Sequence, residues 1–245
     1  MKENQPLRNI NRVITMKKYN KIKKILFTAI CGGLFIACQQ PYNVNDPLQV
    51  LCLGNSITKH PIKEDIEWFS DWGMAASNIE YDYCHQLEKM LCKYHPNSTV
   101  TPLNIASWER NLSCDIDSLI GSYCKNKDII IIRLGENVQD VTTFPDAISR
   151  LVKYCQSKAK RVIITGCFWK NDSKERSIIH AARTNDLTYV PLYWIDNLYN
   201  VRPQIGDTLY DINKKPYVIT QDFIITHPND EGMQMIAETI WGVIR

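Results

Sequence analysis

The chain has 245 residues, of which 44% are hydrophobic and 22% charged, and its formal net charge is +3. These proportions are typical of a soluble globular protein, and they exclude a disordered chain, a collagen and a polytopic membrane protein. The charge is unevenly distributed, because residues 1–38 carry eight basic side chains and one acid, a net +7. The other 207 residues carry 21 basic and 25 acidic side chains, a net −4, so the basic total is no argument for nucleic-acid binding.

The N-terminal segment combines a basic stretch with a 13-residue apolar run, Ile25 to Ala37, that ends at Cys38. A 13-residue helix spans about 20 Å, too short for a bilayer core of about 30 Å, so the pattern predicts an export signal. Ala37-Cys38 resembles a lipobox, in which the cysteine becomes the lipidated first residue. We therefore expect residues 1–38 to be a signal peptide with a lipobox, and Cys38 to anchor the protein in the cell envelope. An ordinary signal peptide with an incidental cysteine is the alternative.

Residues 39–47 are polar, include two prolines and lack periodicity, which predicts a tether to a domain spanning residues 48–245. Seven cysteines lie in that domain, and none has C-x-x-C spacing, so a zinc or thioredoxin-type site is not expected. Most have apolar neighbours, which favours free buried thiols. One or two disulfides are the alternative for an exported protein.

From residue 48 onward, short apolar runs alternate with segments of helical spacing. The predicted strands are 48–53, 99–105, 128–134, 161–168 and 189–192, and the predicted helices are 79–94, 116–124, 144–155, 173–184 and 229–244. Apolar strands separated by amphipathic helices predict an α/β fold of three layers, α/β/α, around a doubly wound, parallel, five-stranded sheet. Residues 193–225 interrupt the alternation and predict an irregular excursion or a hairpin near residues 214–216.

In such sheets ligands bind at the carboxyl ends of the strands, so the residues that follow each strand are the functional candidates. The first predicted strand ends in Gly54-Asn55-Ser56. Ser56 is expected to begin the next helix, where free N–H groups and the positive dipole end favour a nucleophilic hydroxyl. A helix N-cap is the commoner role of such a serine, so Ser56 alone decides nothing.

Two further candidates follow the same logic. Gly135 and Asn137 come after the third strand, where the glycine lets the backbone approach a ligand and the amide can donate to developing negative charge. His227, followed by Pro228, precedes the last helix and is well placed as a general base. Individually, each also fits a turn asparagine or a surface histidine.

Together and in this order, these blocks resemble the SGNH/GDSL hydrolase family, in particular a Bacteroidetes-type lipoprotein esterase branch. The family's Gly-Asp/Asn-Ser, Gly-x-Asn and histidine blocks are matched by residues 54–56, 135–137 and 227–228, and the resemblance spans residues 48–245. It implies a flavodoxin-like SGNH hydrolase fold and a serine esterase that needs no metal or cofactor. Ser56 would be the nucleophile and His227 the base, with Asn137, Gly135 and the main-chain N–H of Ser56 in the oxyanion hole.

The sequence departs from the family at two positions. The second block lacks its usual glycine, so the resemblance assigns that oxyanion contact to a main-chain N–H such as that of Ser107. Three residues before His227, family members carry Asp where this chain has Ile224. Asp222, Asp230 or a backbone carbonyl are the candidates to orient the imidazole, and a Ser-His dyad is the favoured reading.

The implied reaction is hydrolysis of acyl esters, and acetyl esters on a carbohydrate are the expected substrate. The alternatives are a catalytically weakened glycan-binding lipoprotein and a lipid acylhydrolase. Arg133 stands on an apolar strand and is expected to pair with Glu109 or Glu136. Tryptophans in predicted loops suit stacking on sugar rings, although core packing explains most tryptophans; they are Trp68, Trp72, Trp108, Trp169 and Trp194. The expected partners are an ester substrate and a membrane, but no nucleic acid.

Overall fold

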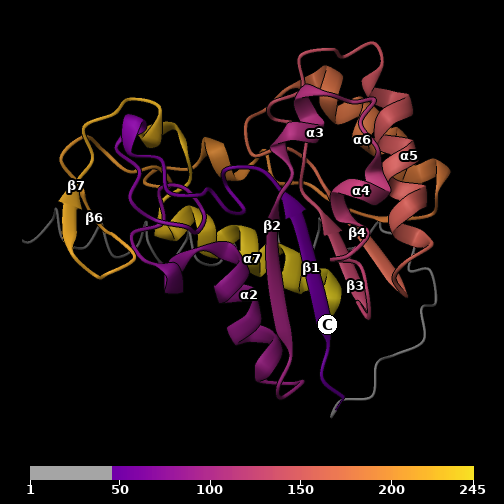
Figure 1. The fold of residues 1–245 in the computed structure, drawn as a ribbon, viewed down its shortest axis with the longest axis horizontal. Helices are drawn as coiled ribbons and strands as arrows, with labels where there is room; N and C mark the ends of the chain where they lie inside the picture. Colours follow the sequence, from indigo (N-terminus) through magenta and orange to yellow (C-terminus); the bar gives the residue numbers. More distant parts are fainter. Residues whose placement is uncertain (1–45) are drawn as a thin grey trace, which may run out of the picture. The chain divides into compact units, whose positions relative to one another are not determined.

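A computed structural model describes residues 46–245, so the signal segment with Cys38 and most of the tether lie outside the described residues. Five strands form one parallel sheet in the order β2-β1-β3-β4-β5 (Figure 1). They are β1 (Gln49–Gly54), β2 (Thr99–Asn104), β3 (Ile129–Ile132), β4 (Arg161–Thr165) and β5 (Thr188–Val190). The predicted doubly wound, five-stranded sheet is confirmed, and its strand order is the flavodoxin-like one.

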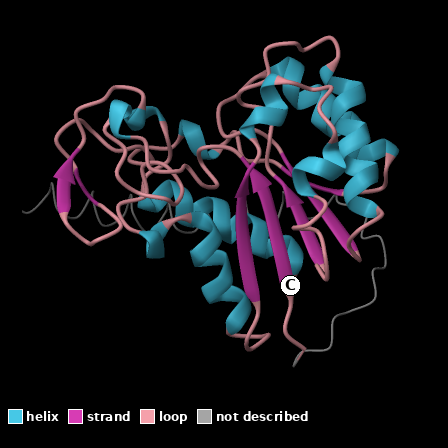
Figure 2. Ribbon diagram, in the orientation of Figure 1, coloured by secondary structure: helices cyan, strands magenta, loops and turns pink. Residues whose placement is uncertain are grey.

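Helices cover both faces of this sheet (Figure 2). They are α2 (Tyr83–Cys92), α3 (Ala106–Arg110), α4 (Ile116–Ile120), α5 (Phe144–Gln156), α6 (Asp172–Thr184) and α7 (Asp230–Ile244). Buried side chains of α2 and α7 pack in the core on one face, and those of α3 to α6 pack on the other. The predicted three layers are therefore present. No helix within residues 46–245 is long and apolar enough to cross a membrane.

Strands β1 and β3, neighbours in the interior of the sheet, are buried on both faces, which explains the apolar runs 50–53 and 129–132. Successive side chains of a strand point to opposite faces, and the two cores divide accordingly. On β1, Val50 and Cys52 join the core with α2 and α7, whereas Leu51 and Leu53 join the core with α5 and α6. The sheet is thus held from both sides, and its carboxyl edge is a rigid platform for the loops that follow.

The segment between β5 and α7 contains the predicted hairpin. Strands β6 (Thr208–Tyr210) and β7 (Pro216–Val218) pair antiparallel. Along the chain, the short 3-10 helices η4 (Ile195–Asn197) and η5 (Ile224–Thr226) precede and follow them. The Tyr210 N–H donates to the Ser77 carbonyl at 2.9 Å, so the hairpin is fastened to the long loop that follows β1. This loop and the hairpin lie together, away from the sheet (Figure 1).

The loop after β1 differs from the prediction, because Ser56 does not begin a long helix. The N–H groups of Thr58 and Lys59 both donate to the Asn55 carbonyl, at 2.9 and 3.0 Å, which makes one helical turn. Pro61 lacks the N–H that would continue it. The chain then runs through η2 (Glu64–Ile66) and η3 (Ile79–Tyr81) before α2 begins. The predicted helix 79–94 is thereby shortened, because Asp82 is the N-cap of α2 and accepts from the His85 N–H.

The seven cysteines of the described residues are free, as predicted, and five of them are buried.

Candidate active site

Ser56 and His227 meet at the carboxyl edge of the sheet although they are 171 residues apart in sequence. Ser56 follows β1 directly, and His227 lies between η5 and α7. The Ser56 Oγ is 2.9 Å from the His227 Nε2, within the distance that direct proton transfer requires. His227 is only 7% exposed, so this contact is shielded from bulk water.

The other ring nitrogen of His227 contacts a backbone carbonyl. Nδ1 lies 2.9 Å from the Phe223 oxygen, and this oxygen can only accept, so Nδ1 carries the proton in the neutral imidazole. Nε2 is then the acceptor that faces the Ser56 hydroxyl. The position three residues before His227 holds Ile224, a buried apolar side chain, so no carboxylate enters there.

Neither aspartate considered for orienting the imidazole does so. Asp222 is exposed, and no hydrogen bond joins it to the ring. Asp230 accepts instead from the Ser77 N–H at 2.7 Å and from the Ser77 Oγ at 2.6 Å. Asn229, the residue before it, caps α7 by accepting from the Gly232 N–H. The carboxylates were the wrong candidates, since the carbonyl of Phe223 already occupies the direction of Nδ1.

Burial lowers the pKa of His227 to about 4, because the charged imidazolium loses solvation in this site. The hydrogen bond to Phe223 opposes the shift, and nearby His60 and Arg133 add to it. His227 is therefore neutral at pH 7, the state in which it can accept a proton from Ser56.

The backbone before Ser56 fits only because residue 54 is glycine. A Cβ on Gly54 would lie 1.9 Å from the Thr58 Oγ1 and 3.1 Å from the Arg133 carbonyl oxygen. This close approach lets the chain turn sharply out of β1 and turns the fully buried Asn55 side chain inward.

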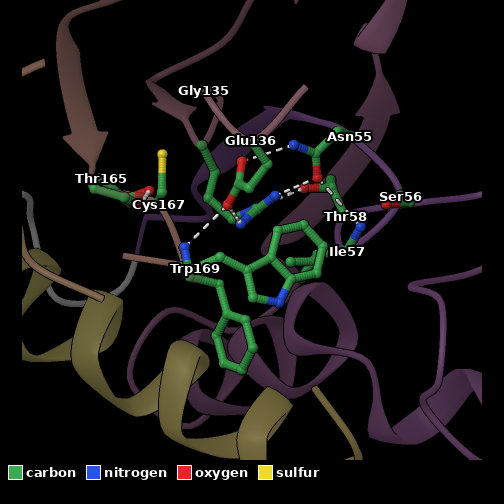
Figure 3. Close-up of polar contacts among 12 residues, drawn as sticks. Asn55, Ser56, Ile57, Thr58, Gly135, Glu136, Thr165, Cys167 and Trp169 are labelled. Atoms are coloured by element: carbon green, nitrogen blue, oxygen red, sulfur yellow. Dashed lines mark hydrogen bonds and ion pairs between the residues drawn. The ribbon is translucent and has the colours of Figure 1, made fainter. Parts of the chain in front are cut away.

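A buried ion pair underlies this turn. The Arg133 guanidinium donates to the Glu136 carboxylate at 2.7 Å, and both side chains are fully buried. Asn55 joins the pair, donating from Nδ2 to Glu136 at 2.7 Å and accepting from Arg133 on Oδ1 (Figure 3). Burial acts to raise the pKa of Glu136, but Arg133 holds it below its usual value. Of the two partners predicted for Arg133, Glu136 is the one that contacts it.

The loop after β3 is held by a second buried carboxylate, that of Glu109. It accepts from the Gly135 N–H at 2.6 Å and from the Asn137 Nδ2 at 2.7 Å. The Gly135 N–H is therefore not free to bind an oxyanion, which corrects its predicted role. Gly135 is still required for geometry, because its φ is +138° and a Cβ there would lie 2.6 Å from the Cys167 sulfur. Asn137 keeps a second side-chain N–H beyond the one that Glu109 accepts.

Two further main-chain donors belong to the predicted oxyanion set. Ser107 is exposed and lies in α3, directly after β2. Within the part of the chain that the structure describes, neither the Ser107 N–H nor the Ser56 N–H makes a hydrogen bond. Both remain open for a ligand.

Of the tryptophans singled out in the sequence, one borders the dyad. The Trp169 ring meets the His227 ring edge to face, with centroids 5.2 Å apart, and its Nε1 donates to the Thr226 carbonyl. Trp68, Trp72 and Trp108 are buried in the cores, as the packing alternative predicts. Trp194 is 37% exposed and donates to the Pro191 carbonyl.

Metal-ligand clusters of three or more His, Cys, Asp or Glu side chains do not occur within residues 46–245. The site brings together a serine, a histidine, an asparagine amide and buried carboxylates.

Comparison with known proteins shows which solved structures share this fold. No family model and no curated protein matches the chain. A solved structure of a variant of an acetyl xylan esterase from Geobacillus stearothermophilus matches with a TM-score of 0.52 and 14% identity, covering 82% of this chain and 96% of the esterase. The chain has the fold of this esterase.

Two other solved structures agree with that fold. A catalytic mutant of an acetylxylan esterase from Geobacillus stearothermophilus matches with a TM-score of 0.50 and 12% identity, over 82% of this chain and 95% of the mutant. An alpha/beta hydrolase enzyme from the metagenome of Lake Arreo, Spain, has a TM-score of 0.50 and 12% identity, over 82% and 96%. At these identities the likeness establishes the esterase fold alone.

Glu109 is the site residue that sequence reasoning did not assign to the oxyanion region. It appeared only as one of two possible partners of Arg133. The absence of the second-block glycine was the one signal that this loop is built differently, and it did not say what replaces it.

Proposed function

We propose that the protein is a serine esterase of the SGNH/GDSL type, which hydrolyses acyl esters through a Ser56–His227 dyad. The observation that carries the proposal is the 2.9 Å contact between the Ser56 Oγ and the His227 Nε2. Its position at the carboxyl edge of an esterase-like sheet supports the same reading.

In the proposed reaction, the Ser56 oxygen attacks the ester carbonyl carbon while His227 takes the hydroxyl proton at Nε2. The tetrahedral intermediate collapses, His227 returns the proton to the leaving alcohol, and an acyl-Ser56 ester remains. Water then adds to this ester with His227 again as the base, which releases the acid and restores the Ser56 hydroxyl. The Phe223 carbonyl holds Nδ1–H throughout and stabilises the imidazolium that forms at each step.

Negative charge that develops on the carbonyl oxygen needs preorganised donors. We assign this role to the second N–H of Asn137 Nδ2 and to the main-chain N–H groups of Ser56 and Ser107. The free state of both main-chain groups supports the assignment.

For the substrate, we propose an acetylated carbohydrate. The similar fold of the acetyl xylan esterase supports the acetyl group, and Trp169 beside His227 offers an aromatic surface for a sugar ring. Rates on p-nitrophenyl acetate, acetylated xylooligosaccharides and a phospholipid, compared as kcat/KM, test this choice. A preference for the phospholipid would favour a lipid acylhydrolase instead.

The deciding experiment for catalysis compares wild type with Ser56→Ala on p-nitrophenyl acetate. We expect the variant to lose at least about 10³-fold in kcat, because the nucleophile is gone. Equal rates for the two proteins would contradict the esterase proposal. A wild type that binds glycans but shows no esterase activity would instead favour the glycan-binding alternative.

We also propose that the protein is a lipoprotein of the cell envelope, anchored through Cys38. The basic stretch, the short apolar run and the Ala37-Cys38 pair support this location.

A further inference from the structure

We propose that Glu109 is a positioning residue for the oxyanion hole, whose carboxylate fixes the Asn137 side chain so that its second N–H faces the reacting carbonyl oxygen. This inference rests on the proposed esterase function and adds a residue to its machinery. No block of the family resemblance assigns a role to Glu109.

The geometry around Glu109 is that of an anchor for two loops. Its Oε1 accepts from the Gly135 N–H at 2.6 Å, the Asn137 N–H at 3.3 Å and the Asn55 Nδ2 at 3.3 Å. Its Oε2 accepts from the Asn137 Nδ2 at 2.7 Å. One carboxylate thus receives four N–H donors from the loops that follow β1 and β3.

The same contacts determine where the Asn137 amide points. The side-chain NH₂ has two hydrogens in one plane, and Glu109 accepts one of them, so the direction of the other is fixed. The main-chain N–H of Asn137 also donates to Glu109, so the same carboxylate holds both the backbone and the side chain of this residue. Such fixed donors stabilise an oxyanion better than mobile ones, because no reorganisation is needed during the reaction.

The short helix α3, directly after β2, positions Glu109 beside the loop that follows β3. After β2, Asn104 Oδ1 accepts from the Ala106 N–H at 2.9 Å and starts α3. This helix has five residues and buries Trp108 and Glu109 on its inner side. Trp108 packs edge to face on Phe144 of α5, which holds the helix in place. The carboxylate therefore reaches the β3 loop from the region where the family's glycine is missing.

The first test replaces the carboxylate by an amide of equal size, Glu109→Gln. A glutamine oxygen can still face Gly135, but its NH₂ then meets the Asn137 NH₂, and two donors repel each other. We expect kcat on p-nitrophenyl acetate to fall by about 10²-fold, the effect of losing one oxyanion donor, while KM changes little. The matched control is Glu175→Gln, a buried carboxylate that contacts the Cys167 N–H and Tyr189 but not Asn137. We expect that control to keep its kcat.

A double-mutant cycle separates positioning from a general structural role. If Glu109 acts through Asn137, then Glu109→Gln should cost almost nothing further in an Asn137→Ala background. If the fold-loss in kcat of the double variant equals the product of the two single fold-losses to within about twofold, the residues act independently. That result would overturn the inference. So would a folded Glu109→Gln protein with the kcat of wild type.

A measurement on wild type covers the case in which Glu109→Gln does not fold. A crystal structure of the protein with an alkyl phosphonate bound covalently to Ser56 mimics the tetrahedral intermediate. We expect the Asn137 Nδ2 to contact both the Glu109 Oε2 and the phosphonyl oxygen. An Asn137 amide that turns away from Glu109, or that does not reach the phosphonyl oxygen, would overturn the inference. Failure of the proposed function is a separate outcome, seen as no Ser56-dependent hydrolysis by wild type.

Discussion

His227 has a backbone carbonyl, not a carboxylate, as the partner of its protonated ring nitrogen. A carbonyl dipole fixes the tautomer as well as a carboxylate does, but it stabilises the imidazolium less, since it carries no net charge. Burial of the ring therefore outweighs the hydrogen bond to Phe223, and the pKa of His227 falls to about 4.

A pH-rate profile tests this environment. The base must be neutral to act, so kcat/KM should rise with pH through about 4 and be level between pH 6 and 7. The folded protein protonates His227 only below about 4, whereas an unperturbed histidine protonates below about 6.5. Stability from this group is therefore lost as the pH falls from about 6.5 toward 4. Tryptophan fluorescence at each pH checks that the protein is folded. An acidic limb near pH 6.5 would contradict the buried, carboxylate-free histidine.

The ion pair between Arg133 and Glu136 makes a prediction about stability. Arg133→Met would leave the fully buried Glu136 carboxylate without its counter-charge, at a cost of about 3–5 kcal/mol in the free energy of unfolding. Urea unfolding measures the loss. The double variant Arg133→Met/Glu136→Gln removes both charges and should be more stable than the single variant. A double variant that is less stable would contradict the assignment of the loss to an uncompensated charge.

At the scale of elements, the start of α7 connects the site to the loop after β1. Asp230, in the first turn of α7, accepts two hydrogen bonds from Ser77, and the Ser77 carbonyl in turn accepts from Tyr210 of β6. The helix that follows His227, the β1 loop and the hairpin are thus joined at one serine.

Removal of this connection should affect stability more than chemistry. Asp230→Ala loses two charge-assisted hydrogen bonds and a favourable charge at a helix N-terminus, which together contribute about 2 kcal/mol. Thermal unfolding should show a lower Tm, with kcat on p-nitrophenyl acetate close to that of wild type. Asp222→Ala, at an exposed aspartate, is the control and should change neither quantity. A large loss of kcat in folded Asp230→Ala would restore Asp230 as a residue that orients His227.

The sequence predicts those helices and strands whose apolar residues recur with a clear period. Ile129–Ile132 is an unbroken buried strand, and α5 buries one face at helical spacing, so both were found from sequence. Helix α3 was missed, because five residues are too few to show a period. The helix expected at Ser56 was wrong, because the His60 N–H donates to the Trp72 carbonyl and Pro61 has no N–H to continue the turn. Pro61 was visible in the sequence, whereas the contact with Trp72 was not.

Some residues of the candidate site could likewise be predicted from the sequence, and others could not. Ser56 and Asn137 could be placed near one another because parallel strands bring their carboxyl ends to one edge. His227 follows η5 and no strand of this sheet, and the family resemblance placed it at the site. Glu109 could not be placed, because its role depends on how separate loops converge after folding. A backbone carbonyl was one of the three expected partners of the imidazole, but the sequence did not identify it as that of Phe223. The missing glycine of the second block was the available signal, and the N–H groups that donate to Glu109 are visible only in three dimensions.

At the scale of the whole molecule, the basic and apolar segment that ends at Cys38 predicts that the protein is attached to a membrane. Cys38→Ala in the full chain should release it from the membrane fraction, because the lipidated thiol is the proposed anchor. Cys31→Ala, in the same apolar run, is the control and should stay in the membrane fraction. Membrane association of Cys38→Ala equal to that of wild type would point to another means of attachment.

The separation of 171 residues between nucleophile and base has a consequence for the order of folding events. Contacts this distant in sequence tend to form late, because closing so long a loop costs conformational entropy before the contact adds stability. During refolding, β1 can pair with its neighbours and present Ser56 before α7 has docked, but such an intermediate has no base. Enzymatic activity should therefore return after helical circular dichroism does, and the lag between the two measures the docking of α7.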